Sequence, residues 1–192
     1  MPCQPIEFSV NLDLPGWIAS LDEALRSCYP TDEDKMRLAI DLALRNVEAG
    51  TGGPFGAAVF DSDSGAVISV GVNRVVPLNN STAHAEMMAF MLAQRRLQSF
   101  RLDATRHHFV LATSAQPCAM CYGACPWAGI HRLLIGARRK DVEALTEFDE
   151  GPMPRNWRKG LERRGISIRR DVLRKEARAV FLAYQKAPGT TY

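Results

Sequence analysis

The chain has 192 residues, of which 46% are hydrophobic and 23% are charged, and its formal net charge is +3. These values are typical of a globular domain with a core of its own, and they argue against a disordered chain. No run of about 18 apolar residues occurs, and residues 1–10 lack the basic and apolar regions of a secretory signal, so neither a membrane span nor a secreted protein is expected.

Residues 1–30 are predicted to form an N-terminal extension and residues 31–192 a single domain. Within the extension, the apolar residues between Trp17 and Cys28 recur at helical spacing. A longer helix is predicted from Thr31, a typical N-cap residue, to about Ala49.

Two short segments, Gly56–Phe60 and Ala66–Val72, are predicted to form a β-hairpin, because a polar segment that ends in glycine joins them. The next helix is predicted from about Ala83 to Leu97, with Ser81 or Thr82 as its N-cap.

The second half of the chain continues to alternate between strands and helices. A strand is predicted at His108–Thr113, and Pro117 fits the first position of the helix that follows. The remaining predicted elements are a strand at Leu133–Gly136, an edge strand at Ile166–Arg169, and a last helix over about 172–185 capped by Asp171. This order predicts an α/β protein with three layers, in which a mixed sheet of about five strands lies between helices.

Two short motifs carry the chemistry of the chain. HAE at residues 84–86 begins one predicted helix, and PCAMC at residues 117–121 begins another. One imidazole and two thiolates supply three protein ligands for Zn²⁺, which leaves a fourth position for water. The combination H-x-E…P-C-x-x-C is the signature of zinc-dependent nucleobase deaminases. The sequence therefore predicts one zinc ion per chain, bound by His84, Cys118 and Cys121.

Glu86 is predicted to be a catalytic proton carrier. It lies beside the predicted ligands without being needed as one, and a carboxylate in that place can move protons. It would transfer the proton of the attacking water to the ring nitrogen next to the reacting carbon, and later assist the loss of ammonia.

Each motif has a simpler interpretation when it is taken alone. A single C-x-x-C is also typical of a redox pair, and a structural zinc site would need a fourth protein ligand, which does not occur at a close spacing. His107 and His108 are interpreted as strand residues, and Cys125 as a small buried hydrophobic residue. The conjunction of the two motifs, each at a predicted helix start, favours the catalytic site.

Charge and cysteine content bear on partners and compartment. Residues 1–65 hold eleven acidic and four basic residues, whereas residues 130–192 hold fifteen basic and eight acidic ones. Three interpretations stay open: solvated charged helices, a nucleic-acid-binding surface, and charge complementarity between the halves of a dimer. Five cysteines, two of them assigned to the metal, favour a reducing cytoplasm over a disulfide-bonded secreted protein.

From about residue 33 to residue 187 the chain resembles the cytidine-deaminase-like zinc deaminases. Within them it is most similar to the bacterial guanine deaminases, including forms that also accept the triazine ammeline. The two zinc motifs carry the resemblance to the superfamily. Similarity to the guanine branch rests on GGPFG at residues 52–56, NRV at 73–75 and FDEGP at 148–152.

The resemblance implies a three-layer α/β/α fold of the cytidine-deaminase type and a role for each matching residue. His84, Cys118 and Cys121 would bind zinc, Glu86 would be the proton shuttle, and Glu150 would be a second catalytic carboxylate that cytidine-type enzymes lack. The implied substrate-binding residues are Asn73, which would bond the base, Phe55 and Trp127, which would flank its ring, and Ala85. Core packing of the aromatic residues, a turn at Asn73 and a surface loop at Glu150 are the simpler alternatives.

Two further points concern the partner and one departure from the family. Gln116 stands where the family usually has Glu, which removes a charge beside the zinc helix. The resemblance implies a homodimer, and guanine-type members exchange C-terminal segments that close the partner's site. In this chain that closing role would fall to Tyr192.

The predicted function is the zinc-dependent hydrolytic deamination of guanine to xanthine and ammonia, with ammeline or related amino-purines and triazines as further candidate substrates. A tRNA adenosine deaminase is one alternative; the basic C-terminal half favours it, whereas residues 148–152 and the acidic N-terminal half oppose it. The other is a zinc-stabilised interaction module without activity, which the intact Glu86 opposes.

Overall fold

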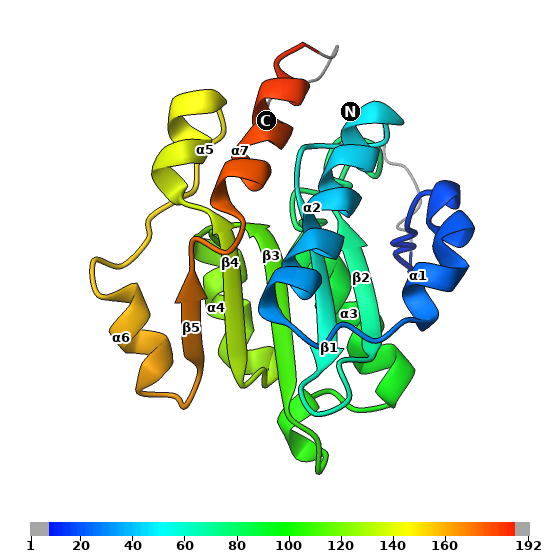
Figure 1. Ribbon diagram of the computed structural model, residues 1–192, viewed down its shortest axis with the longest axis vertical. Coiled ribbons are helices and arrows are strands. Elements are labelled where there is room, and N and C mark those ends of the chain that lie inside the picture. The colour runs from blue at the N-terminus through cyan, green and yellow to red at the C-terminus, as the bar shows by residue number, and fades with distance from the viewer. Residues whose placement is uncertain (1–7, 187–192) are drawn as a thin grey trace.

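The computed structural model describes residues 8–186, which form one mixed sheet between helical layers (Figure 1). The strand order is β2-β1-β3-β4-β5. β1 (Gly56–Asp61) is antiparallel to β2 (Val67–Val72) and β3 (Phe109–Ala115), whereas β4 (Arg132–Ala137) is parallel to β3 and to β5 (Ser167–Arg170). The predicted α/β fold with a mixed five-stranded sheet is confirmed.

Helices cover both faces of this sheet (Figure 1). On one face lie α2 (Asp32–Glu48) and α7 (Arg174–Tyr184), and on the other lie α3 (Ala85–Leu97) and α4 (Ala119–Ala128). The remaining helical segments after α2, none of them predicted from the sequence, are η2 (Leu102–Ala104), α5 (Arg139–Leu145) and α6 (Trp157–Glu162).

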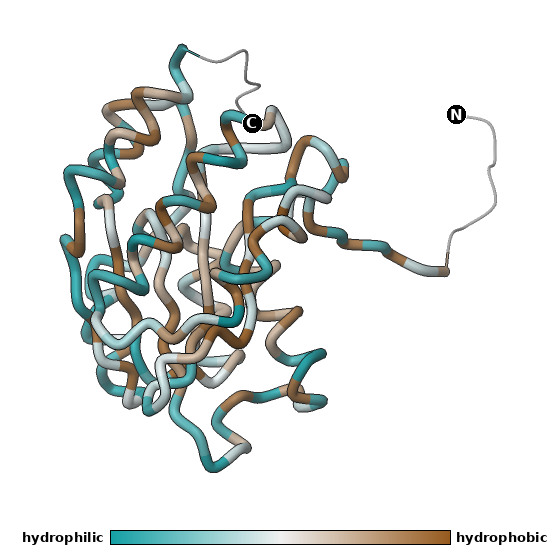
Figure 2. The backbone as a smooth tube through the Cα atoms, turned by 45° about the vertical axis from the view of Figure 1, so that its right-hand side comes forward, coloured by the Kyte–Doolittle hydropathy of each residue, from teal (hydrophilic) through white to brown (hydrophobic). Residues whose placement is uncertain are grey.

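Alternation along the strands divides the interior into two apolar clusters. In β1, Ala58 and Phe60 pack on the α2 side, whereas Ala57 and Val59 pack on the α3 side. The covering helices alternate between hydrophilic and hydrophobic along the chain (Figure 2), as expected for elements with one face on a sheet. Both sheet faces are therefore buried, and the edges and ends of the sheet are left for function.

The helix predicted from Thr31 is confirmed in detail, whereas one strand begins slightly later than predicted. Thr31 caps α2, with its Oγ1 accepting a hydrogen bond from the Asp34 amide in a capping box. β3 begins at Phe109 rather than at His108, so both histidines precede the strand. The His107 side chain pairs with Asp61, with 2.9 Å between Nδ1 and Oδ2.

The predicted cap of α3 is wrong. The N-cap is His84 rather than Ser81 or Thr82. The Thr82 hydroxyl donates to Asn80 Oδ1 at 2.7 Å, so this side chain stabilises a turn before the helix and is not available to cap it.

The predicted starts of α4 and α7 are also wrong. Cys118 is the N-cap of α4, so Pro117 lies outside the helix. Leu173 is the N-cap of α7, because the Asp171 carboxylate binds the Arg138 guanidinium at 2.5 and 2.6 Å instead of a helix end. At α7 a tertiary contact therefore displaced a helix boundary that local preferences predicted.

The N-terminal segment forms two short helices beside the β2 edge rather than one (Figure 1). They are η1 (Gly16–Leu21), a 3₁₀ helix, and α1 (Asp22–Arg26). Ile18 and Leu21 are buried in the cluster on the α2 side, and Cys28 forms a β-bridge with Ala66 in the hairpin turn. The division of the chain at residue 30 stays a prediction.

Ion pairs within the chain account for much of its uneven charge. Asp32 binds both Arg132 and Arg169, at 2.6 and 2.5 Å, and so joins the acidic N-terminal part to the basic C-terminal part. Asp141 binds Arg174 at 2.7 Å within the C-terminal part. Among residues 8–186, no helix is long and apolar enough to cross a membrane.

Gly71 in β2 lets α3 approach the sheet. A Cβ atom there would lie 2.0 Å from the Ala85 carbonyl oxygen and 2.6 Å from the Ala89 amide nitrogen, both in the first turns of α3. The helix that carries His84 and Glu86 can therefore lie this close to β2 only because residue 71 is a glycine, which has no side chain.

Gly71→Ala should lower the free energy of unfolding by about 2 kcal/mol or more, because the added methyl group forces α3 away from β2. Gly16→Ala is the matched control, since a Cβ atom there meets nothing within 4 Å. Urea denaturation of both variants measures the difference, and equal midpoints would show that α3 does not depend on Gly71.

Candidate active site

The side chains suited to metal binding and catalysis lie at one edge of the sheet, the one formed by the carboxyl ends of β2, β3 and β4. β2 and β3 are both antiparallel to β1, so their carboxyl ends lie at the same edge, where the chain turns toward α3 and α4. β4 ends there too and leads into α5 and the loop at residues 146–151. In open α/β sheets this edge is where ligands bind.

Two helix starts bring the three predicted metal ligands together. His84 and Cys118 are the N-caps of α3 and α4, and Cys121 lies in the first turn of α4. Their ligand atoms all lie within 4.8 Å of one another, the only such group found among residues 8–186. The 3.6 Å between His84 Nδ1 and Cys118 Sγ agrees with the roughly 3.6 Å that tetrahedral Zn–N and Zn–S bond lengths require. The donor set therefore fits zinc.

Their common environment shifts the pKa values of the two thiols in opposite directions. A hydrogen bond with Cys121 lowers the pKa of Cys118 to about 4, against the opposing effect of burial and with help from His84. The same hydrogen bond, together with burial, raises the pKa of Cys121 well above its ordinary value. A divalent cation held between the sulfurs favours the thiolate form of both.

Glu86 lies in the first turn of α3 and is 6% exposed. Burial, and then the negative charge of Cys118, raise the pKa of its carboxyl group above the usual range. Thr113 Oγ1 donates to Glu86 Oε1 at 3.2 Å and orients the carboxyl group. Thr113 was not predicted, although a polar residue near the end of an apolar strand is a signal that could have found it.

The structure also places Glu150 at this edge, in the loop after α5. The Ala119 amide donates to the Glu150 carbonyl oxygen at 3.0 Å, and Arg139 Nη1 donates to the Gly151 carbonyl oxygen at 3.3 Å. The side chain is 6% exposed. Burial, followed by the charges of Cys118 and Glu86, raises the pKa of Glu150 to about 8. A surface-loop role for Glu150 is therefore excluded.

A cavity of about 220 Å³ joins these groups. Seven of the predicted site residues line it: Phe55, Asn73, His84, Ala85, Glu86, Cys118 and Glu150. The lining also includes Gln116, noted for its departure from the family, and four residues without a predicted role: Ser81, Ala115, Phe148 and Asp149.

Cys121 does not line this cavity, because it is fully buried among the metal ligands. Trp127 is the other predicted site residue that does not line it. It lies near the end of α4, is 77% exposed, and lines a separate hollow with Tyr122 and Arg164. The helix is the reason, because Trp127 lies six residues beyond Cys121 and more than one turn from the metal ligands.

Asn73 presents a defined hydrogen-bonding group to the cavity. It is 1% exposed, and its Oδ1 accepts hydrogen bonds from the Gly53 and Val75 amides, at 3.4 and 3.3 Å. With the oxygen held by two main-chain donors, Nδ2 is the group that can donate to a bound molecule.

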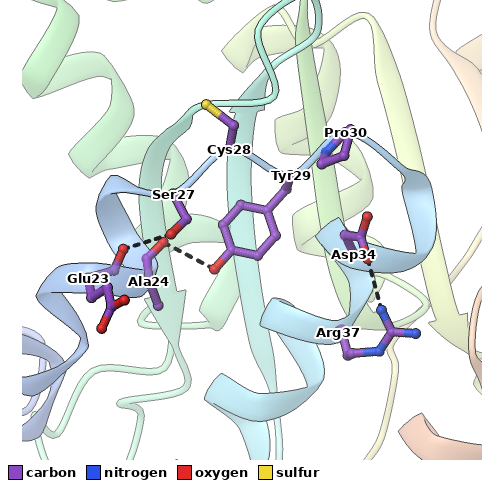
Figure 3. Close-up of a pocket in the computed structure, with 8 residues that line it drawn as sticks. All are labelled: Glu23, Ala24, Ser27, Cys28, Tyr29, Pro30, Asp34 and Arg37. Carbon is purple, nitrogen blue, oxygen red and sulfur yellow. Dashed lines mark hydrogen bonds and ion pairs between the residues drawn. The ribbon is translucent and has the colours of Figure 1, made fainter.

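A second hollow, of about 520 Å³, lies between α1 and the start of α2 (Figure 3). Its polar groups are bonded within their own segments: the Tyr29 hydroxyl donates to the Ala24 carbonyl oxygen, and Arg37 pairs with Asp34. The residues suited to catalysis therefore gather at the sheet edge and not here.

Comparison with known proteins assigns the chain to a family. Residues 30–137 match the model of the cytidine and deoxycytidylate deaminase zinc-binding region. The chain belongs to this family. Its donor set and the zinc-binding region that defines the family together make zinc its cofactor, and the protein is a zinc-dependent deaminase, a hydrolase of the nucleobase-deaminase kind.

Similar proteins include guanine deaminases and tRNA-specific adenosine deaminases. Guanine deaminase of Bacillus subtilis (strain 168) is 37% identical over 134 residues, which cover 70% of this chain and 81% of that protein. A solved structure of guanine deaminase from Nitrosomonas europaea has a TM-score of 0.89 at 40% identity and covers 96% of this chain and 100% of the other. A tRNA-specific adenosine deaminase of Buchnera aphidicola subsp. Schizaphis graminum (strain Sg) is 31% identical and covers 79% of this chain and 91% of its own length.

Glu86→Gln should keep one zinc ion per chain and the fold, but lower turnover by about a hundredfold or more, because general acid–base transfer is lost. Cys121→Ser is the matched variant and should lose zinc as well as turnover, since a thiolate ligand is removed. Elemental analysis and ammonia release measure the two effects. Residual turnover above about a tenth of the original would show that Glu86 is not the proton carrier.

Proposed function

We propose that the deaminase hydrolyses guanine to xanthine and ammonia. The observation that carries this proposal is the position of Glu150, a second buried carboxyl group at the cavity that Glu86, His84 and Cys118 line. Guanine presents its N1–H and its 2-amino group side by side. The pKa of about 8 that burial gives the Glu150 carboxyl group would fall when a divalent cation binds nearby. The ionised carboxylate has two acceptor oxygens and can accept from both.

Glu150 also supplies discrimination against pyrimidines. Cytosine has no N–H beside its amino group, so its ring nitrogen would place a lone pair against the Glu150 carboxylate. A buried polar site rejects an analogue that leaves its groups unpaired, by factors of about 10⁴ in favourable cases. Glu150 therefore favours a substrate with adjacent N–H donors.

The division of work between the residues follows from their positions. Bound zinc supplies a Lewis acid and an acidified water. Glu86, oriented by Thr113, would move one proton of the attacking water to the ring nitrogen beside the reacting carbon. Glu150 would accept a hydrogen bond from N1–H, which the product keeps, and relay the second proton of the water to the departing amine, while Asn73 Nδ2 donates to an acceptor on the base.

An aromatic wall holds the base in plane. Phe55 lines the cavity and contacts Phe148 edge-on, with 5.2 Å between ring centroids, and Phe181 at 5.8 Å. The residue thus packs in the core and also presents a face to the cavity, a rigid surface for a planar ring.

The ion pairs weigh against a nucleic-acid substrate. Arg132, Arg138, Arg169 and Arg174 belong to the basic half of the chain, and each is bound to a carboxylate of the same chain. Paired guanidinium groups are less available to phosphates than a free basic surface would be.

The setting of the reaction is also proposed. A homodimer is supported by the resemblance to guanine deaminases, whose exchanged C-terminal segments would give Tyr192 its role; that residue lies outside the described part of the chain. Free thiols at Cys28, Cys118, Cys121 and Cys125 support a reducing cytoplasm. The reaction would place the protein in purine catabolism, with ammeline and related amino-triazines as additional substrates.

Ammonia release from a panel of guanine, cytosine, adenosine and ammeline tests the substrate. Guanine should give the highest kcat/KM, because it alone among the natural bases in the panel offers two adjacent donors to Glu150. The protein should also fail to bind tRNA at physiological salt. A preference for cytosine or tRNA would contradict the proposed guanine substrate and leave only the assignment to the deaminase family. No ammonia release from any substrate would favour the inactive interaction module.

Glu150→Gln should lower guanine turnover by about a hundredfold or more while zinc content stays at one per chain, since a neutral amide cannot accept and relay the proton. The substitution should also lower the ratio of kcat/KM for guanine to kcat/KM for the poor substrates. Asp149→Asn is the matched control, because it removes a neighbouring charge in the same loop. Near-original guanine turnover in Glu150→Gln would rule out its catalytic role.

A further inference from the structure

A chain of hydrogen bonds joins the N-terminal segment to Asn73. Asn46 in α2 is fully buried, and its Nδ2 donates to the carbonyl oxygens of Asn73 and Gly53, each at 2.9 Å. Asn46 Oδ1 accepts from Thr51 Oγ1 at 2.8 Å, and Thr51 Oγ1 accepts from Trp17 Nε1 at 2.9 Å. Two side chains therefore link Trp17 in η1 to the residue beside the cavity.

The direction of each hydrogen bond fixes the orientation of the next group. An indole N–H can only donate, so the Thr51 hydroxyl accepts from Trp17 and turns its own hydrogen toward Asn46 Oδ1. That choice settles which end of the Asn46 amide faces the two carbonyl oxygens. A flipped amide would place its oxygen against both of them, which is unfavourable in a buried site.

The region where these groups meet has no spare room. A Cβ atom at Gly52 would lie 1.9 Å from the Asn73 carbonyl oxygen and 2.8 Å from Asn46 Nδ2. The Asn73 main chain is therefore held between the Asn46 amide and the glycine loop, and a loss of the amide hydrogen bond moves the main chain that carries the Asn73 side chain.

Arg74 provides a second connection between the same parts. Its Nη1 donates to the Thr51 carbonyl oxygen at 2.5 Å, and its Nε donates to the Asp13 carbonyl oxygen at 3.3 Å. The residue that follows Asn73 thus binds both the Thr51 loop and the N-terminal segment.

We propose that Asn46 is a positioning residue for substrate recognition, and that the N-terminal segment at Asp13–Trp17 braces it through Thr51. The inference rests on the proposed function, in which Asn73 Nδ2 donates to the base. Asn46 does not line the cavity; it acts by fixing the main chain of Asn73, so that Nδ2 meets an acceptor such as a purine carbonyl oxygen.

Thr51→Val tests the inference, because valine keeps the shape of threonine and removes the hydroxyl that orients Asn46. The KM for guanine should rise about fivefold, the effect of one misplaced hydrogen bond, while kcat stays within about twofold and zinc remains at one per chain. Thr51→Ser, which keeps the hydroxyl, should restore KM to within about twofold of the original. Equal KM values in the valine and serine variants would overturn the inference.

A double-mutant cycle with Asn73→Ala separates this inference from the proposed function. Thr51→Val should add no further rise in KM once the Asn73 side chain is absent, because the two residues act through one contact. An equal rise with and without Asn73 would overturn the inference alone. An unchanged KM in Asn73→Ala itself would overturn the base-binding role of Asn73, and the inference with it.

Trp17→Phe tests the contribution of the N-terminal segment. It keeps an aromatic ring and removes the indole donor, so the KM for guanine should rise about twofold to threefold, in the direction of Thr51→Val. A rise in KM would support the proposed role of the N-terminal segment in positioning Asn46. An unchanged KM would overturn the role of the N-terminal segment.

Discussion

The constraint on which the site depends is the meeting of two helix starts at one sheet edge. β2 and β3 end at the same edge only because both are antiparallel to β1, and α3 and α4 follow them there. His84 and Cys118 are the N-caps of these helices, so the zinc ligands come together where the two helices begin. The free energy that folds the sheet therefore also pre-organises the metal site.

Burial makes the ionised forms of several acidic groups at this edge unfavourable, and a bound metal ion would offset that cost. Glu86 and Glu150 are almost fully buried beside the Cys118 thiolate, and burial raises the pKa of each carboxyl group. Several negative charges in one apolar place are costly, and a divalent cation offsets that cost. The raised pKa values of both groups would suit the proton transfer that we propose for them. One arrangement of buried acidic groups would thus serve both metal binding and the proposed proton transfer.

The sequence predicted the parts of this arrangement that local patterns encode. Metal-ligand spacing, the hairpin, the Thr31 capping box and the mixed sheet are short-range features, and all are present. The cap predicted at Asp171 was wrong because its carboxylate binds Arg138 of another element, whereas the cap predicted at Ser81 or Thr82 was wrong because Thr82 bonds locally to Asn80. Trp127 lies away from the cavity, because a motif match carries no information on which way a helix turns its far end. Asn46 belongs to no motif, since the role proposed for it depends on a residue 27 positions away in the chain.

Aromatic packing ties the loop at residues 146–151, which carries Glu150, to the core. Phe148, two residues before Glu150, contacts Phe55 edge-on and stacks on Tyr184 of α7 at 5.8 Å between ring centroids. Phe55 in turn contacts Phe181 in the core. One aromatic cluster therefore supports the wall of the cavity and the loop that carries Glu150. Because interiors of this kind are close-packed, a change in volume at any of these rings is transmitted to both. Substrate shape and the position of Glu150 are consequently set together, by packing that α7 completes from the far end of the chain.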